Sequence, residues 1–267
     1  MIEAAIPRIL AVLRERTGTD FTRYRTATVQ RRIANRMISV GAASFDDYLA
    51  LLQSSAGEAE QLLNRVSIKV SRFYRNRASF DLLRARVIPE LAARFSTLGQ
   101  PLRVWSAGCG CGEEPYTFAM LLDEAGLPGE VHATDIDPAA LDAAEHGLYA
   151  SDAATELPQE LARSYLVSLK LRRPLVAVPR RLRARICLER LDLLAGTIPG
   201  GGGFDLVSCR NVLIYLQGEV RDQVLATLVG ALRPGGYLFL GEAEWPPESL
   251  SAALESQGQG TRIFKLK

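Results

Sequence analysis

The pattern of apolar residues in the first part of the chain predicts a small bundle of helices. Up to about residue 66, apolar side chains recur at the spacing of amphipathic helices. The first helix carries Ile6 and Leu13, and the second stops before Gly41. The third has Ser44 as its N-cap, and a fourth runs roughly over residues 58–66. No strand is expected in this region.

From Leu102 onward the pattern changes to short apolar runs that alternate with helical segments. Strands are expected at 102–108, 130–137, 204–211, 237–242 and 261–267. Helices are expected at 114–126, 138–147 and 220–232, the last ended by Pro234-Gly235-Gly236. This alternation is typical of an α/β fold, a doubly wound and mostly parallel sheet with helices on both faces. Such sheets bind ligands past the carboxyl ends of their strands.

One basic segment interrupts this alternation, and it completes the predicted domain organisation. Residues at about 165–190 are short, basic and β-prone, and they are interpreted as a small antiparallel β insertion. The chain is then expected to divide into a helical N-terminal domain (1–70), a linker with the first helix of the next domain (71–100), and an α/β domain that contains the insertion (101–267).

Composition and charge exclude several classes of protein. The formal net charge of +2 is too small to indicate nucleic-acid binding, and no apolar run is long enough to predict membrane insertion. The start of the chain lacks the pattern of a signal peptide, so the four cysteines are expected as reduced thiols in the cytoplasm. No metal site is expected, because Cys109 and Cys111 are one residue apart and the chain has only two histidines.

The chemistry is concentrated in the stretch SAGCGCGEEPY at residues 106–116, between a predicted strand and a predicted helix. Gly108, Gly110 and Gly112 alternate there, which favours close approach of a ligand to the backbone over a simple tight turn. Glu113 and Glu114 follow, where a phosphate-binding loop would have a lysine. Acids at a helix N-terminus can be purely structural, yet they also repel pyrophosphate and attract a cation. The loop therefore favours S-adenosylmethionine (AdoMet), which carries an ammonium and a sulfonium.

The next predicted strand supports this interpretation. Asp135 ends the run VHATD, at the position where an acid accepts hydrogen bonds from ribose hydroxyls in doubly wound folds. Asp137 stands directly before Pro138 and is better explained as a helix N-cap. The glycine loop and Asp135 together make an AdoMet-dependent methyltransferase the leading interpretation.

Three segments resemble one family closely: RVWSAGCGCGEEPYTFAMLL, HATDIDPAALDAAEHGLY and FDLVSCRNVLIYL followed by LRPGGYLFLGEAE. They are similar to the chemoreceptor glutamate methyltransferases, the CheR family, and the resemblance extends to RRIANRM and SFDDYLALL near the N-terminus. It implies an AdoMet methyltransferase fold with an inserted β-subdomain. It also implies transfer of a methyl group to glutamate carboxylates of bacterial chemoreceptors, with S-adenosylhomocysteine (AdoHcy) as the product.

The resemblance also implies roles for individual residues, by matching positions. Arg75 and Tyr215 are expected to hold the incoming carboxylate as catalytic residues. Contacts with the cofactor are expected from Lys69, Ser71, Arg75, Gly108, Gly110, Glu113, Asp135, Asp192, Leu193, Arg210 and Asn211. Two positions depart from the family pattern: Lys69 replaces an amide, and Cys111 replaces a threonine or serine.

The expected partner is the cytoplasmic helical domain of methyl-accepting chemoreceptors, bound by a monomer. Arginines of the second predicted helix are expected to face the acidic helices of the receptor: Arg25, Arg31, Arg32 and Arg36. The inserted β-subdomain has no glycine in VSLKLRRPLVAV, so no tether to a receptor C-terminal peptide is expected. Two other functions remain open at this point, a small-molecule methyltransferase and an AdoMet- or AdoHcy-binding signalling module with little catalysis.

Overall fold

The computed structural model describes residues 2–67, 71–258 and 260–267. The chain forms two compact units, which are described separately here. The first comprises Met1–Ile68 together with Ile214–Arg221, and the second comprises Lys69–Leu213 and Asp222–Lys267. The segment 214–221 comes from the second half of the sequence and nevertheless clusters with the N-terminal helices, which the sequence-based domain boundaries do not include.

The first unit is a bundle of four helices, as its apolar periodicity predicts: α1 (Ile2–Thr17), α2 (Thr26–Val40), α3 (Phe45–Ser54) and α4 (Ala56–Val66). Fully buried apolar side chains such as Ile9 and Ile33 form its core. Ser44 caps α3 through a hydrogen bond that its Oγ accepts from the Asp47 N–H at 3.1 Å. Gly41 ends α2 with a φ of 71°, a left-handed conformation that glycine adopts without strain.

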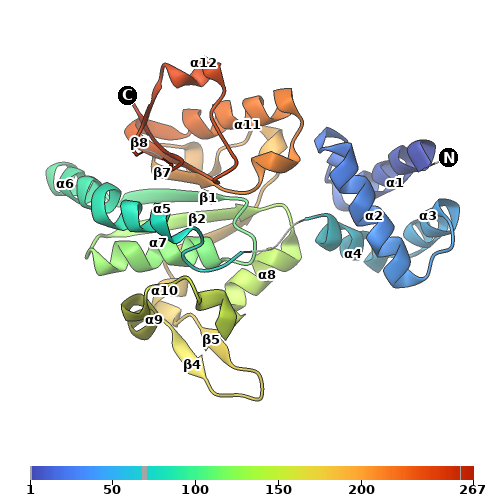
Figure 1. Cartoon of the computed structure of the whole chain (residues 1–267), viewed down its shortest axis with the longest axis horizontal. Helices are drawn as coiled ribbons and strands as arrows, with labels where there is room; N and C mark the ends of the chain where they lie inside the picture. Colours follow the sequence, from blue (N-terminus) through green and yellow to red (C-terminus); the bar gives the residue numbers. More distant parts are fainter. Residues whose placement is uncertain (1, 68–70, 259) are drawn as a thin grey trace. The chain divides into compact units, whose positions relative to one another are not determined.

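The second unit is built on a sheet of seven strands (Figure 1). Across the sheet the order is β6 (Ile186–Arg190), β2 (Gly129–Asp135), β1 (Leu102–Ala107), β7 (Phe204–Cys209), β8 (Leu232–Leu240), β10 (Ile263–Leu266) and β9 (Leu254–Ser256). The first five strands are parallel, whereas β10 is antiparallel to both β8 and β9. This is the doubly wound, mostly parallel sheet that the alternation of strands and helices predicts.

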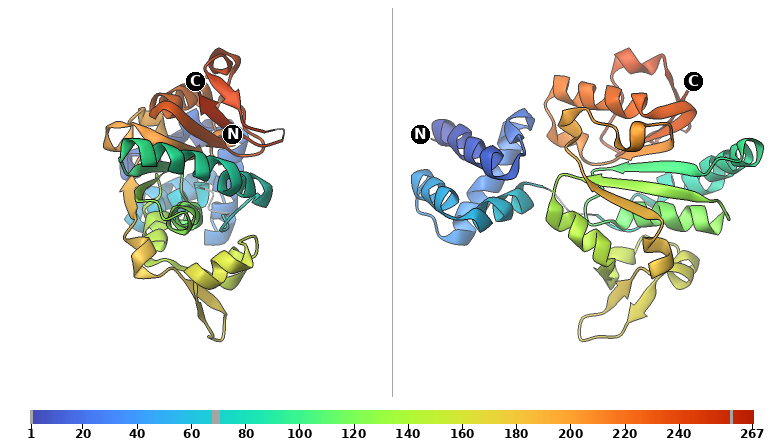
Figure 2. Two further views of the ribbon diagram at one scale, coloured as in Figure 1. Left: turned by 90° about the vertical axis from the view of Figure 1, so that its left-hand side faces the viewer. Right: turned by 180° about the vertical axis from the view of Figure 1, so that it is seen from behind.

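Helices cover both faces of this sheet. The connections from β1 to β2 and from β2 to β6 contain α7 (Glu113–Glu124) and α8 (Pro138–His146), and the connection from β7 to β8 contains α11 (Gly218–Gly230). In Figures 1 and 2, α7 and α8 lie on the opposite side of the sheet from α11. Before β1 come α5 (Arg77–Leu82), a π-helical turn (Leu83–Val87) and α6 (Ile88–Leu98), and a short α12 (Glu248–Ser251) precedes β9.

The predicted antiparallel insertion exists, but its extent differs from the sequence-based range of about 165–190. It is a three-stranded sheet with the order β3 (Leu148–Ala150), β5 (Leu175–Ala177) and β4 (Val167–Leu169), beside α9 (Gln159–Tyr165) and α10 (Arg180–Arg183). Ile186–Arg190 is instead the edge strand of the main sheet and pairs parallel to β2. An edge strand needs only one apolar face, so its alternating exposed residues made it resemble the insertion.

The sequence-based end of the helix before Pro234 was also wrong. α11 ends at Gly230, and β8 already begins at Leu232, so Pro234-Gly235-Gly236 lies inside a strand. The pairing of β7 with β8 is irregular there, because Phe204 pairs with Leu232 whereas Leu206 pairs with Tyr237. A proline and a glycine at a φ of 72° are accommodated in such a bulge.

Candidate active site

The glycine loop joins β1 to α7 at the carboxyl edge of the sheet. Its first two residues, Gly108 and Cys109, donate their backbone N–H groups to the Thr134 carbonyl near the end of β2, at 2.8 and 2.9 Å. All three glycines of the loop have positive φ angles: 74° at Gly108, 57° at Gly110 and 100° at Gly112. The loop is therefore bound to the neighbouring strand in a conformation that other residues rarely adopt.

The three glycines meet different surroundings. A Cβ atom at Gly108 would lie 2.5 Å from Cγ2 of Val212, and one at Gly112 would lie 2.7 Å from Cβ of Ala144. A Cβ at Gly110 would meet nothing within 4 Å. Close packing against the protein thus explains Gly108 and Gly112, whereas Gly110 faces open space, as expected for backbone that a ligand approaches.

Asp135 fixes the middle of this loop. One oxygen of its carboxylate accepts a hydrogen bond from the Gly110 N–H at 2.8 Å, and the other accepts one from the Asp137 N–H at 3.0 Å. Asp137 is the N-cap of α8 and accepts from the Ala139 N–H at 2.9 Å, as its position before Pro138 predicts. The Asp135 carboxylate is half-buried.

Glu113 is a buried carboxylic acid at the first position of α7. Its residue is 6% exposed, and burial raises the pKa of its carboxyl group. Its Oε2 atom has no hydrogen-bond partner within the described part of the chain. A buried carboxylate oxygen without a donor is unfavourable, so this position is suited to a ligand that brings a cationic donor.

A buried arginine, Arg210, links the end of β7 and the start of α7 to the linker that contains Arg75 and Asn76. The Arg210 side chain, 3% exposed, forms an ion pair with Glu114 at 3.1 Å. It also donates hydrogen bonds to the Arg75 carbonyl at 2.7 Å and to Oδ1 of Asn76 at 2.5 Å. Glu114 accepts a second hydrogen bond from the Ser106 hydroxyl at 2.7 Å. The two Nη atoms of Arg210 are thus bound to protein groups, whereas its buried Nε has no hydrogen-bond partner within the described residues. The cofactor contact expected from the resemblance stays a prediction.

The linker that Arg210 holds has an unusual backbone. Tyr74 and Asn76, on either side of Arg75, have φ angles of 60° and 66°. The Tyr74 N–H donates to Oγ1 of Thr117 at 3.1 Å, and the Asn76 N–H donates to the Glu156 carboxylate at 2.9 Å. Arg75 is half-buried between these two fixed residues. Of the two other predicted linker residues, Ser71 is half-buried and Lys69 lies outside the described residues.

The remaining residues predicted to contact the cofactor follow β6 and β7. Asp192 begins a 3₁₀ turn and accepts a hydrogen bond from the Leu194 N–H at 2.9 Å; Leu193 is half-buried. The preceding Leu191 donates its N–H to the Asp135 carbonyl at 3.0 Å, so this segment lies beside the end of β2. Asn211, after β7, has a φ of 60°.

Tyr215, the second residue predicted to be catalytic, belongs to the segment that clusters with the helical unit. It ends a 3₁₀ turn (Leu213–Tyr215), and its carbonyl accepts a hydrogen bond from the Arg25 N–H at 2.8 Å. The next residue, Leu216, forms an antiparallel bridge with Tyr24. A role of Tyr215 in the transfer step stays a prediction.

The four arginines predicted to contact a receptor are not equivalent in the helical unit. Arg25 and Arg31 are exposed, and Arg32 is half-buried. Arg36 forms a bidentate ion pair with Glu58, with its Nε 2.8 Å from Oε1 and its Nη2 2.6 Å from Oε2. The Arg36 side chain is only 14% exposed. Arg36 therefore stabilises the bundle itself, and its expected contact with a receptor stays a prediction.

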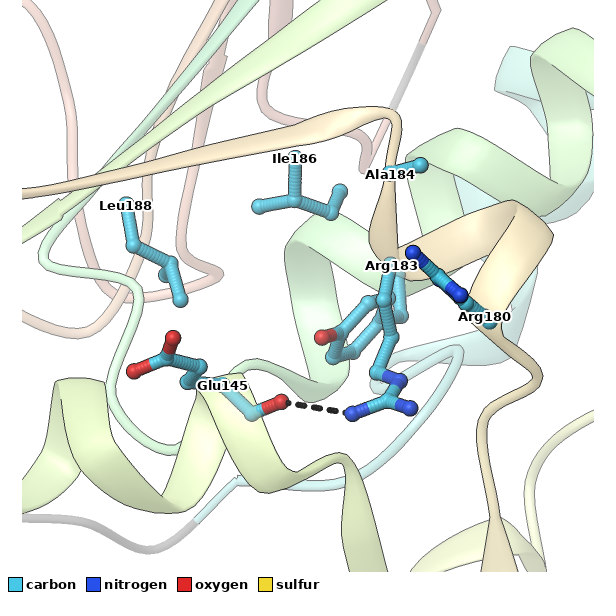
Figure 3. Close-up of a pocket in the computed structure, with 7 residues that line it drawn as sticks. Glu145, Arg180, Arg183, Ala184, Ile186 and Leu188 are labelled. Atoms are coloured by element: carbon cyan, nitrogen blue, oxygen red, sulfur yellow. Dashed lines mark hydrogen bonds between the residues drawn. The ribbon is translucent and has the colours of Figure 1, made fainter.

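A surface pocket of about 470 Å³ lies elsewhere in the second unit, between α8, α10 and β6 (Figure 3). Arg180 and Arg183 of α10 line it, with Ile186 of β6 and Glu145 of α8. Figure 3 shows the Arg183 guanidinium donating to the Glu145 backbone carbonyl, at 3.2 Å. None of the residues predicted for the cofactor lines this pocket, and nothing in it suggests a particular ligand.

Two further observations bear on the class of site. Nowhere in the described ranges do three or more histidine, cysteine, aspartate or glutamate residues form a group that could hold a metal ion. Among the helices of residues 2–67, 71–258 and 260–267, none is both long and apolar enough to span a membrane.

Sequence reasoning missed the residues that support this site rather than form it. Ser106, Glu114, Asn76 and Glu244 act through hydrogen bonds to backbone or to other side chains. Most of their partners lie on other elements of the fold, so no local pattern identifies them. The one available signal was Glu114, an acid directly after Glu113, which was interpreted only as part of the acidic start of α7.

The strand order, the glycine loop after β1 and the acid at the end of β2 define an AdoMet-dependent methyltransferase. The residues present fit this cofactor, because Gly110 faces open space and the buried Glu113 oxygen lacks a donor among the described residues. The chain belongs to the CheR methyltransferase family. The model of the family's SAM-binding domain matches residues 69–258, and that of its all-alpha domain matches residues 4–67.

Relatives of this chain agree with the assignment. A chemotaxis protein methyltransferase of Escherichia coli is 34% identical over 249 residues, which are 91% of this chain and 84% of the relative. One of Listeria innocua is 34% identical over 235 residues, 87% of each chain. An uncharacterized 104.1 kDa protein of Rhodobacter capsulatus is 35% identical over 246 residues, and there the match spans 90% of this chain but only 25% of the relative.

Proposed function

We propose that this chain transfers the methyl group of AdoMet to glutamate side chains of bacterial chemoreceptors, giving glutamate methyl esters and AdoHcy. The observation that carries the proposal is the buried Glu113 carboxylate, beside a glycine loop whose central residue faces open space. The names of the relatives support a chemotaxis substrate. The resemblance of GEEPY, ATDID and CRNVLIY to the chemoreceptor methyltransferases supports glutamate as the acceptor.

Three parts of the chain would hold the cofactor. Glu113 would accept hydrogen bonds from the methionine ammonium, which supplies the donor that its buried oxygen lacks. Asp135 would accept hydrogen bonds from the ribose hydroxyls while keeping the Gly110 N–H that it already binds. Asp192 and Leu193 would lie beside the adenine, because their segment is hydrogen-bonded to the end of β2.

The proposed reaction needs little acid–base chemistry from the protein. When bound, AdoMet supplies an electrophilic methyl group on a positive sulfur. A glutamate carboxylate has a reference pKa of about 4.3, so it is already the nucleophile at neutral pH and needs no general base. Alignment of the two reactants can contribute about 7–11 kcal/mol to such a transfer. We assign Arg75 to orienting the incoming carboxylate and Tyr215 to the transfer step.

The receptor would be recognised chiefly by charge. Arg25, Arg31 and Arg32 give α2 a basic surface, and the substrate implied by the resemblance is an acidic helical bundle on the cytoplasmic side of the receptor. Complementary charges of this kind raise the association rate and select partners. We propose that the chain acts on this domain as a monomer.

A labelled methyl group tests the proposal directly. The protein is incubated with methyl-labelled AdoMet and the cytoplasmic domain of a chemoreceptor, and label is followed on the receptor. A methyl ester releases its label as methanol at alkaline pH, whereas methylated nitrogen does not. A receptor whose candidate glutamates are changed to alanine serves as the matched control and should remain unlabelled.

Calorimetry with AdoHcy separates the proposal from its competitors. Binding of AdoHcy without labelling of several receptors would favour a signalling module with little catalysis. Transfer of label to small molecules but to no receptor would favour a small-molecule methyltransferase. Receptor labelling that resists alkali would contradict glutamate as the acceptor.

A further inference from the structure

The loops that follow β7 and β8 are joined by one buried carboxylate, that of Glu244. This residue is 4% exposed. Its Oε2 atom accepts hydrogen bonds from the Asn211 N–H at 2.9 Å and from the Gly241 N–H at 2.7 Å. The Glu244 N–H in turn donates to the Gly241 carbonyl at 2.9 Å. A single side chain thus fixes the backbone just past the carboxyl ends of two neighbouring parallel strands.

Gly241 shows how tight this arrangement is. A Cβ atom there would lie 2.6 Å from the Glu244 carboxylate oxygen and 2.8 Å from the Asn211 nitrogen. Real Cβ atoms do not approach other atoms this closely, and here one of the two atoms is backbone, which cannot move aside. Glycine is therefore required at 241 so that the Glu244 carboxylate can reach both N–H groups.

This arrangement stabilises an unusual backbone conformation at Asn211. Its φ of 60° makes it one of three residues other than glycine with a positive φ among the described residues. Asparagine tolerates this conformation better than most residues, but it is still disfavoured and needs support from its surroundings. The hydrogen bond from its N–H to Glu244 provides that support.

Asn211 also carries an acceptor that the protein leaves unused. Its side-chain Oδ1 is buried and has no hydrogen-bond partner in the ranges that the structure describes. The next residue, Val212, is the one whose methyl group would collide with a Cβ at Gly108. Asn211 is therefore adjacent in sequence to a residue that packs on the glycine loop, where the cofactor is expected.

We propose that Glu244 is a positioning residue, which holds Asn211 in its left-handed conformation and so directs Oδ1 towards the methylsulfonium group of AdoMet. This inference rests on the proposed function. A methyl group on a positive sulfur is polarised, and a carbonyl oxygen can accept weak C–H···O hydrogen bonds from it. AdoHcy lacks both the methyl group and the positive charge on sulfur. The Oδ1 atom therefore strengthens the binding of AdoMet relative to the binding of AdoHcy.

The difference between the two nucleosides provides the test. The affinities of the full chain for AdoMet and AdoHcy are measured by calorimetry, and their ratio is compared between variants. Glu244→Ala should lower the ratio of AdoMet affinity to AdoHcy affinity about two- to fivefold, the size expected for one weak C–H···O bond. Asn211→Ala should lower it equally, and the double variant should be no worse than Asn211→Ala. Glu242→Ala, an exposed acid of the same loop, should leave the ratio unchanged.

One further variant and one cofactor-free measurement keep the test decisive. Should Glu244→Ala fail to fold, Glu244→Gln retains an acceptor of the same size and should fall between wild type and Asn211→Ala. Hydrogen exchange at the Asn211 and Gly241 amides should speed up in both Glu244 variants without any ligand. A ratio that stays at the wild-type value in the folded variants would overturn the inference and leave the proposed function intact. Wild-type protein that binds neither nucleoside would instead overturn the proposed function.

Discussion

Replacing Arg210 by lysine separates two roles that this residue could have, support of the linker and contact with the cofactor. Lysine keeps the positive charge beside Glu114 but cannot reach the Arg75 carbonyl and the Asn76 side chain at the same time. It also loses the stacking of the guanidinium on Phe239, 4.4 Å from the ring centre. Removing two hydrogen bonds at roughly 1 kcal/mol each, with some packing, gives a cost of about 2–3 kcal/mol.

This cost should be visible in thermal unfolding. For a unit of this size, about 2–3 kcal/mol corresponds to a fall in the melting temperature of roughly 5–10 °C. Turnover on receptors should also fall, because Arg75 is then no longer held by its carbonyl, whereas AdoHcy affinity should change less than turnover. Arg210→Met should cost more, about 3–5 kcal/mol, since Glu114 is then buried without its cation.

A matched control is available at the opposite end of the same strands. Arg233 lies near the start of β8 and pairs with the buried Asp205, near the start of β7, at 3.3 Å. Arg233→Lys should lower the melting temperature but leave turnover of the remaining folded protein unchanged. The reasoning is refuted if Arg210→Lys keeps the wild-type melting temperature and loses AdoHcy affinity and turnover in parallel, because that result indicates direct contact with the cofactor.

Four other predictions concern the proposed site and the helical bundle. Asp135→Ala should weaken AdoHcy binding by about 1.5–3 kcal/mol in calorimetry, as for a lost charge-assisted hydrogen bond, and unchanged affinity would exclude the ribose role. Tyr215→Phe should lower turnover and leave AdoHcy affinity nearly intact; wild-type turnover would reduce Tyr215 to packing. Arg25→Glu with Arg31→Glu should slow receptor methylation without changing AdoHcy affinity, and normal methylation at low salt would remove α2 from the mechanism. Burial alone would raise the pKa of Glu58, but hydrogen bonds from Arg36 and Tyr48 lower it below its usual value. Glu58 therefore stabilises the bundle above about pH 4.5, and the protection factors for amide exchange in α2 and α4 should fall as the pH falls below that value, less so in Arg36→Met.

Much of the fold could be predicted from the sequence because its signals are local. The spacing of apolar residues, the capping by Ser44 and the stop at Gly41 depend on neighbours within a few residues, and the structure has all three. The errors arose where tertiary contacts decide the outcome. Ile186–Arg190 joins the main sheet because β2 offers a parallel edge, and Pro234 lies within a strand because a bulge accommodates it.

The site shows the same division between local and distant signals. The glycine loop and Asp135 are recognisable because their residue types suit the ligand at fixed positions after two strands. Arg36 illustrates the opposite case, since nothing in its own helix reveals that Glu58, 22 residues away, pairs with it. A helix of arginines is thus indistinguishable from a uniform basic surface until the packing of α4 is known.

The unusual backbone conformations in this chain suit a reaction that depends on alignment of the two reactants rather than on acid–base chemistry. In the described part of the chain, the residues other than glycine with positive φ are Tyr74, Asn76 and Asn211. Tyr74 and Asn76 lie on the linker, which Arg210 ties to the end of β7. Asn211 directly follows β7 and is tied by Glu244 to the loop after β8. Such conformations persist only where the surrounding structure enforces them. A carboxylate that is already ionised needs correct placement opposite the methyl group and little else, so rigid backbone at this edge of the sheet is what the proposed reaction requires.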